Sequence, residues 1–306
     1  MSTSITTTYA GEFAGKYISA ALLSADTLEG GGITIKPNVK FKEVLKTLST
    51  NALVKDAACD FADQSVVTLA ERILQPEEFQ VNLELCKKDF RSDWEAIEMG
   101  YSAFDTLPPS FADFLLGHIA AKVAQKTEQT IWTGTNATAG EFDGFSALLL
   151  ADATVIDVVG TAVTAANVIA EMGKVVDAIP TSVYGKEDLY IYVSSKIARA
   201  YVRALGGFGA NGLGANGVSA MGTTWFNGGD LAFDGVKLFV CSGMADDDMV
   251  AAQKSNLYFG TGLLSDHNEV KLIDMADLDG SQNVRVVMRY TAGVQTGIGA
   301  DIVYYT

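Results

Sequence analysis

The chain has 306 residues, a hydrophobic fraction of 48%, a charged fraction of 19% and a formal net charge of -15. These values exclude an intrinsically disordered chain, allow one large domain or two smaller ones, and argue against a dedicated nucleic-acid reader, which is normally basic. The three cysteines form no CxxC pair, the first residues lack the pattern of a signal peptide, and no apolar run approaches the ~18–20 residues that span a bilayer. We therefore expect a globular protein that is made and used in a cytoplasm.

The first 55 residues are expected to form an N-terminal arm. Tyr9, Phe13 and Tyr17 lie four residues apart, which favours a short amphipathic helix, and the glycines at 30–32 end it. A basic stripe follows in this otherwise acidic chain, made of Lys36, Lys40, Lys42 and Lys46. Two interpretations remain open: the stripe is a solvated face, or it docks on an acidic neighbour.

Two alternating segments predict an extended β-hairpin loop over residues 56–92. Residues 67–73 and 79–85 alternate apolar and polar side chains, and a Gln-Pro-Glu-Glu turn separates them. Arg72, Glu77 and Glu78 would lie at or near the exposed tip and are candidate assembly residues. If so, deleting residues 72–80 should leave a folded protein that assembles poorly. A short helix is expected next, at residues 93–101.

A long helix is predicted over residues 110–131. Two prolines disfavour helix before residue 110, and Ser110 with Asp113 resembles a capping box. Apolar side chains then recur at helical spacing, and Gly134 is suited to the position after the last turn. At ~1.5 Å per residue the helix is about 33 Å long, well above the usual length in a globular domain.

The remainder predicts a mixed α/β region. A helix at 164–179 precedes a buried strand at 189–193, and Ser194 or Ser195 caps a further helix that runs to Leu205. A glycine-rich loop occupies residues 206–222. Further strands are expected at 236–240, 257–259, 270–274, 284–290 and 302–305. The last two are candidates for paired strands that run back to the first half of the chain.

The glycine-rich loop contains a formal GxGxxG at residues 207–212 and an overlapping copy at 212–217. A dinucleotide site needs this motif after a strand and at the start of a helix. Here it follows a helix and no amphipathic helix comes after it, so we interpret the segment as a flexible loop. Gly209 and Asn211 are candidate assembly residues in it. No Walker motif is present.

Other candidate chemical sites are weak. The chain has two histidines, His118 and His267, without an HxxxH pair or a GxSxG elbow, which argues against a zinc site or a serine hydrolase. The acidic run 246–248 could attract a cation but lacks EF-hand spacing, so a solvated turn is the simpler interpretation. The acidic residues near Trp94 are expected on the surface of a helix. Nothing in the sequence fixes the separation of two of them, as a glycosidase pair would require. We predict no catalytic, metal or cofactor site, and no enzyme.

The order of these segments resembles the major capsid proteins of tailed bacteriophages, whose fold is named after phage Hong Kong 97. The resemblance covers nearly the whole chain. It rests on a pattern like E-x-x-x-W-x-G from Glu128 to Gly134, the GEFDG loop at 140–144, and the strand-Ser-Ser-helix of residues 189–205. Phe233-Asp234-Gly235-Val236 and the later Asn-Leu-Tyr-Phe-Gly at 256–260 complete it.

The resemblance implies an α+β phage major capsid fold. Its parts would be an N-terminal arm (1–55), an extended β-hairpin loop (56–92), a peripheral domain with a long spine helix and sheet (93–145 and 276–306) and a mixed α/β axial domain (146–275). Copies would assemble as hexamers and pentamers into an icosahedral shell around packaged double-stranded DNA, without sequence-specific contact. Portal and scaffolding proteins are expected partners, and no membrane is involved. The location would be the virion capsid, assembled in the host cytoplasm.

Two other classes remain open. An oligomeric α/β enzyme could use the loop at 206–222 as a lid or nucleotide loop. A protein that builds a compartment or a surface array without phage origin is the third possibility. The low charged fraction favours a chain whose surface is covered by neighbouring copies, because the cores of such contacts carry few charges.

Overall fold

The computed structural model describes residues 26–50, 56–57, 59, 67–90, 109–205, 231–262 and 270–306. These residues belong to two compact units. The first contains Glu78–Lys126 and Leu263–Thr291, and the second contains Ala25–Glu77, Thr127–Gly262 and Ala292–Thr306. The helices predicted near Tyr9 and at 93–101, and the glycine-rich loop with Gly209 and Asn211, lie outside the described residues.

The first unit is built on antiparallel strands. Residues 284–288 of β12 (Asn283–Thr296) pair with β11 (Val270–Asp274), and β12 also pairs with β4 (Glu77–Cys86). Val284, Val286 and Met288 are buried at every second position, as a strand with one covered face requires. The short helices α2 (Lys87–Phe90) and α8 (Ala276–Asp279) flank these strands along the chain. The unit also contains the greater part of the predicted long helix, α3 (Pro109–Thr133).

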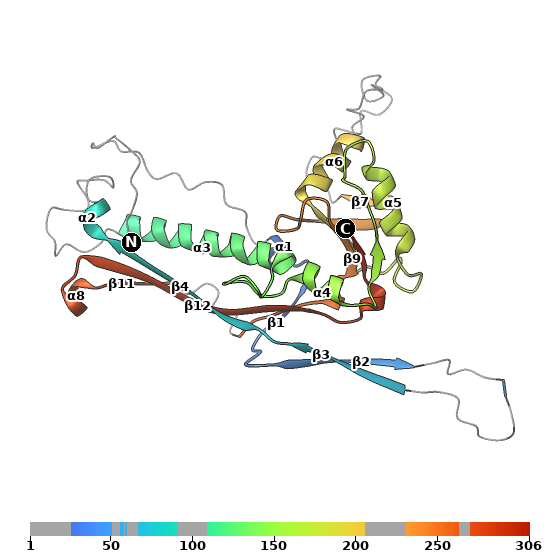
Figure 1. Ribbon diagram of the computed structural model, residues 1–306, viewed down its shortest axis with the longest axis horizontal. Coiled ribbons are helices and arrows are strands. Elements are labelled where there is room, and N and C mark those ends of the chain that lie inside the picture. The colour runs from blue at the N-terminus through green and yellow to red at the C-terminus, as the bar shows by residue number, and fades with distance from the viewer. Residues whose placement is uncertain are drawn as a thin grey trace. The chain divides into compact units, whose positions relative to one another are not determined.

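The second unit is centred on a six-stranded sheet (Figure 1). Its order is β5 (Ile156–Val158), β13 (Val303–Tyr305), β9 (Met249–Gln253), β6 (Leu189–Ser194), β8 (Val236–Cys241) and β7 (Ala232–Phe233). β6 is parallel to β8 and antiparallel to β9, while β13 is parallel to β5 and antiparallel to β9. The sheet is therefore mixed, and every pairing across its centre joins segments distant in sequence.

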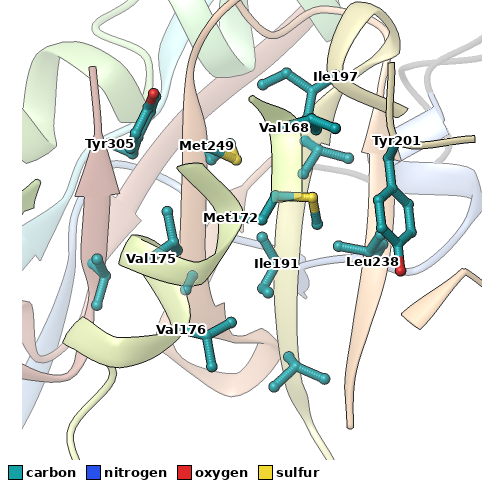
Figure 2. Packing of buried hydrophobic residues seen from close by; sticks show 14 of the residues in the cluster. Val168, Met172, Val175, Val176, Ile191, Ile197, Tyr201, Leu238, Met249 and Tyr305 are labelled. Atoms are coloured by element: carbon teal, nitrogen blue, oxygen red, sulfur yellow. The ribbon is translucent and has the colours of Figure 1, made fainter. Parts of the chain in front are cut away.

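One face of this sheet is covered by α5 (Val168–Ala178) and α6 (Ser195–Leu205) (Figure 2). Met172 and Val175 of α5, and Ile197 of α6, are fully buried against Ile191 of β6 and its neighbours. On each helix the apolar residues recur three or four positions apart and form one face. On each strand every second residue points to the same face, and the core lies where these two kinds of face pack together.

The ends of these helices have local causes. The Ile197 N–H donates to Ser194 Oγ (3.3 Å), which confirms Ser194 as the cap of α6. The helix expected from residue 164 begins only at Val168. The side-chain oxygen of Asn167 accepts hydrogen bonds from the Thr164 N–H (2.7 Å) and hydroxyl (2.9 Å). This local turn competes with helical hydrogen bonding and delays the helix by one turn.

Aromatic rings pack on the opposite face of the sheet. Trp132, near the end of α3, lies 5.4 Å from the Tyr192 ring and 5.3 Å from the Phe145 ring at the start of α4 (Phe145–Ala151), measured between centroids. Phe239 continues the cluster beside Tyr192 (5.6 Å). A Cβ on Gly32 would lie 2.7 Å from the Phe239 ring, which explains why glycine follows α1 (Asp26–Glu29) here.

Residues 26–39, part of the expected arm, pack into the second unit, where Thr27, Ile33 and Val39 are buried. β1 (Thr34–Lys36) is parallel to β10 (Leu257–Gly260), and β10 is antiparallel to residues 293–296 of β12. Single 3-10 turns, η1 (Lys254–Asn256) and η3 (Gly299–Asp301), precede β10 and β13.

The predicted hairpin pairing is wrong, although both of its strands exist. β3 (Val67–Leu74) pairs along its whole length with β2 (Glu43–Thr50), whereas β4 pairs with β12. Figure 1 shows β2 and β3 side by side as a two-stranded ribbon. The antiparallel pair therefore consists of residues 43–50 and 67–74, and Gln75 and Pro76 connect two different sheets.

The two C-terminal strands lie in different sheets and do not pair with each other. β12 returns to β4 in the first half of the chain, as expected, but β13 lies between β5 and β9. The strands β2, β5, β7 and β9 were not expected from the sequence.

Candidate assembly surfaces

The β2–β3 ribbon carries an exposed apolar face. In the register, Val44 is opposite Ile73, Leu48 is opposite Leu69, and Thr50 is opposite Val67. These positions alternate along each strand and therefore share one face. The aliphatic side chains on it are 44% to 69% exposed. We call this surface the ribbon face, and it is the largest grouping of exposed aliphatic residues among the described strands.

A pair of charges interrupts the ribbon face. Lys46 and Glu71 are directly opposite each other, between the Leu48–Leu69 pair and the Val44–Ile73 pair. Both residues are exposed. Among the described residues no ion pair involves either of them. Lys46 thus lies where the basic stripe was predicted, but it shares its face of β2 with the exposed Val44 and Leu48.

The base of the ribbon is fixed within its own unit. Leu74 is fully buried and packs with Val39, Leu45 and the partly buried Tyr258. The Arg72 guanidinium donates to Thr296 Oγ1 (2.8 Å) and forms an ion pair with Asp152.

Burial of Asp152 acts to raise the pKa of this carboxyl, but hydrogen bonds from Thr154 and Arg72 outweigh burial and hold the pKa below its usual range. Arg72 is engaged within the chain. Deleting residues 72–80 would remove a core strand end, so a folded deletion variant is no longer expected.

The other lysines of the stripe have separate surroundings. Lys36 forms an ion pair with Glu43 (3.1 Å). Lys40 and Lys42 are exposed, and the Lys42 ammonium lies 5.3 Å from the centroid of the Phe41 ring, a side chain that is itself 71% exposed. The predicted stripe is therefore not one surface. Lys36 is paired within the chain, whereas Lys40 and Lys42 are exposed on either side of Phe41, ahead of β2.

Glu77 and Glu78 differ although they are adjacent. Glu77 accepts a hydrogen bond from the Asn136 side-chain amide (2.8 Å) in the loop after α3. Asp143 and Glu141 of the GEFDG segment accept from backbone N–H groups of the same loop, Asn136 (2.8 Å) and Thr135 (3.1 Å). The acidic residues of this motif therefore hold its own turn together.

Glu78 instead lines a groove of about 580 Å³ in the first unit. β4 contributes Glu78, Phe79 and Gln80 to the groove, and β12 contributes Arg289, Tyr290 and Thr291. The Phe79 and Tyr290 rings are 5.5 Å apart. Glu78 and Arg289 are both exposed. Over the described part of the chain, neither has an ion-pair partner. Successive residues of a strand point to opposite faces, so Glu78 and Arg289 lie on the exposed face of these strands and the two rings lie on the other.

A buried polar cluster explains the E-x-x-x-W-x-G pattern. Glu128 is 1% exposed and accepts hydrogen bonds from the Thr27 N–H (3.1 Å) and hydroxyl (2.5 Å). The Trp132 indole N–H donates to the same hydroxyl (2.9 Å). Burial raises the pKa of Glu128. A Cβ on Gly134 would lie 2.5 Å from the Thr130 and Phe142 carbonyl oxygens. Glycine is therefore required at this position by steric crowding, and not by a positive φ.

The acidic run 246–248 is used inside the chain. Asp247 accepts hydrogen bonds from Lys196 (2.7 Å) and the Val163 N–H (2.8 Å), and Asp248 accepts from the Tyr304 hydroxyl (2.8 Å). Hydrogen bonding from Lys196 lowers the pKa of Asp247, whereas burial raises that of Asp248. These contacts fix a loop, so Asp247 and Asp248 are engaged within the chain, whereas the sequence had predicted a solvated turn.

Among the described residues, no group of three or more His, Cys, Asp or Glu side chains is arranged to hold a metal ion. His118 lies on α3, whereas His267 is outside the described residues. None of the helices described is long and apolar enough to cross a membrane.

Sequence reasoning missed the ribbon face because Lys46 was grouped with the other lysines. The signal was present: Val44, Lys46 and Leu48 alternate with Leu45 and Thr47, which is the period of a strand.

Solved structures resemble this chain over nearly its full length. The capsid of an empty GTA particle computed with C5 symmetry has a TM-score of 0.62 at 13% identity, over 95% of this chain and 92% of that one. The chain has the fold of a phage capsid protein. The capsid of Myoviridae phage XM1 gives 0.59 at 11% identity, over 96% and 95% of the two chains. Mycobacterium phage Adephagia gives 0.58 at 18% identity, over 94% and 91%.

The structural likeness confirms the resemblance to phage major capsid proteins at the level of fold, and with it the α+β class. No family model and no curated protein matches the sequence. At 11% to 18% identity few side chains are shared, so the likeness concerns the fold.

Proposed function

We propose that this chain is the major capsid protein of a tailed phage. Copies assemble as hexamers and pentamers into an icosahedral head that encloses double-stranded DNA. Assembly takes place in the host cytoplasm, with portal and scaffolding proteins as partners. The protein is a structural component and no enzyme. The observation that carries the proposal is the likeness to capsid structures across at least 94% of this chain in the three comparisons above.

The ribbon face supports this role. Its five aliphatic residues are exposed in the single chain, and exposed apolar patches of this kind mark surfaces that other proteins cover. A two-stranded ribbon is only marginally stable in water by itself, so a covering partner also stabilises it. In a shell of identical subunits, that partner is a second copy of the chain.

The charge of the chain also suits a container for DNA. A net charge of -15 disfavours adhesion of the phosphate backbone to the protein, so DNA can be packaged without sticking to the wall. The acidic balance is compatible with DNA as a content that receives no sequence-specific contact.

Electron microscopy of the purified chain tests the proposal. We expect closed shells, or hexameric sheets and tubes when scaffolding is absent, and sedimentation should show large particles that dissociate on dilution or mild denaturation. A small oligomer that keeps one size over a broad concentration range, and that binds a nucleotide tightly by calorimetry, would contradict the proposal and favour the enzyme class.

A further inference from the structure

Residues 26–36 are attached to the second unit at both ends. We call this segment, which contains α1 and β1, the strap. Its second half is held through the backbone, because β1 pairs with β10 and the Tyr192 hydroxyl donates to the Gly32 carbonyl (2.5 Å). Its first half is held through Thr27, whose N–H and hydroxyl both donate to the Glu128 carboxyl. One titratable side chain therefore accepts two hydrogen bonds at the start of the strap.

The surroundings of Glu128 favour an uncharged carboxyl group. The residue is 1% exposed, and among the described residues no lysine, arginine or histidine forms an ion pair with it. The titratable groups that face it are Asp26 on α1, whose negative charge repels a carboxylate, and the buried Cys241 thiol on β8. The neighbouring strand β6 presents Tyr192, whose hydroxyl is directed to the Gly32 carbonyl. A buried charge without a cation is costly, and burial is the main cause of the raised pKa of Glu128.

We propose that Glu128 is a pH-sensitive latch for the strap: the neutral acid holds the strap closed, and loss of its proton loosens the strap. In the closed cluster a carboxylate is a buried charge without a cation, whereas water hydrates it once the strap opens. The closed form therefore binds the proton more tightly than the open form. Opening becomes easier as the pH rises above ~4.3, the ordinary value of a glutamate, and levels off once Glu128 is ionised in the closed form as well.

Opening of the strap has a structural consequence. β10 lies between β1 and β12, so departure of β1 leaves one edge of β10 unpaired. An unpaired strand edge is a template for pairing with another chain. The strap also packs on aromatic rings, since a Cβ on Gly32 would lie 2.7 Å from the Phe239 ring. Acidic solution therefore favours the form of the subunit in which this edge and these rings are covered.

Hydrogen exchange of the full-length subunit tests the latch. After correction for the intrinsic pH dependence of exchange, protection of residues 26–36 should fall by about tenfold or more between pH 4 and 8, which corresponds to a tenfold difference in proton affinity between the two forms. Glu128→Gln keeps a neutral side chain that accepts from the Thr27 N–H. In this variant the protection should change by less than about twofold over the same range.

A matched control and a second measurement accompany this experiment. Glu29→Gln removes a carboxylate from an exposed position of α1 and should keep the pH dependence of the wild type. In the W94F/W225F background Trp132 is the only tryptophan, and the cluster itself is unchanged. Because the Trp132 indole N–H donates to Thr27, its fluorescence should change over the same pH range as the protection. This measurement decides the matter if Glu128→Gln fails to fold.

The inference is overturned if protection of the strap in the wild type stays constant or rises with pH, or if the Trp132 fluorescence does not change. It is also overturned if Glu128→Gln keeps the pH dependence of the wild type, because another group would then be responsible. The latch is a property of the single subunit, so each of these outcomes leaves the proposed shell function unaffected.

Discussion

The Thr27 hydroxyl donates a 2.5 Å hydrogen bond to Glu128, a residue 101 positions further along the chain. The same hydroxyl accepts from the Trp132 indole N–H, so one small side chain completes the hydrogen bonding of two buried partners. This contact fixes the segment that leads into β1 against the end of α3. It gives the Glu-x-x-x-Trp spacing a structural meaning that does not depend on chemistry at the site.

Thr27→Val tests this contact. Valine keeps the shape but leaves the Trp132 N–H and one Glu128 oxygen without a partner, so we expect a loss of about 2–4 kcal/mol in the free energy of unfolding. Thr27→Ser retains the hydroxyl and should cost only about 1 kcal/mol for the lost methyl group. Urea unfolding of the unassembled subunit measures both. Equal losses for the two variants would show that the hydroxyl is not important.

Two glycines predict opposite outcomes for the same substitution. Gly134→Ala brings a Cβ to 2.5 Å from two carbonyl oxygens and should destabilise the subunit by about 1–3 kcal/mol. Gly173 lies within α5, where a Cβ would meet no atom within 4 Å, so Gly173→Ala should stabilise by about 0.5–1 kcal/mol. Thermal unfolding distinguishes them, and a neutral effect at Gly134 would contradict the crowding at the end of α3.

Assembly should depend on the apolar character of the ribbon face. The double variant L48T/L69T replaces two residues that are 64% and 69% exposed, so the subunit should fold normally. It should form fewer particles, since the lost apolar area lies in the contact. Ala70→Thr, on the opposite face of β3, is the control and should assemble like the wild type. Normal particle yield from L48T/L69T would remove the ribbon face from the contact.

The Glu171 carboxylate predicts a pH dependence of subunit stability. Hydrogen bonds from Lys174 (2.7 Å) and Tyr305 (2.7 Å) hold the pKa of Glu171 below its usual range. Because the pKa in the folded state lies below that in the unfolded chain, the carboxylate stabilises the fold above pH ~4.3, and this contribution is lost as the pH falls through the folded value.

Glu171→Gln should therefore reduce the free energy of unfolding by about 1–2 kcal/mol at pH 7, and by less as the pH falls toward 3. Denaturant unfolding between pH 3 and 7 measures the difference from the wild type. Asp177→Asn, at an exposed position of the same helix, is the control and should stay within about 0.5 kcal/mol at every pH. A Glu171→Gln difference that does not change with pH would exclude the ion pair as its source.

Local signals identified elements well where helical or strand periodicity coincided with a terminating residue. The start of α6 follows from Ser194, and α3 ends at Thr133, directly before Gly134. The start of α5 was predicted one turn too early. The apolar periodicity of residues 164–179 does not reveal the turn that the Asn167 side chain forms with Thr164. β9 was missed because it is short and contains two alanines, which carry little strand signal.

Strand pairing was beyond local reasoning. Residues 67–73 and 79–85 are separated by a short polar turn with proline, which is typical of a hairpin, yet the chain continues from one sheet into another at Gln75 and Pro76. The partner of β3 was hidden in residues 43–50, where the lysine suggested a solvated arm. Alternation identifies a strand and its two faces, but it does not determine which neighbour accepts its hydrogen bonds. The ribbon face was therefore recognised only once this pairing was known.

β13 has a consequence for the timing of synthesis. Residues 303–305 form an inner strand between β5 and β9, and Tyr305 is fully buried. A ribosome releases β5, β6, β8 and β9 earlier, but their sheet stays open until this segment emerges. Only a chain that has been synthesised through Tyr305 can therefore complete this core.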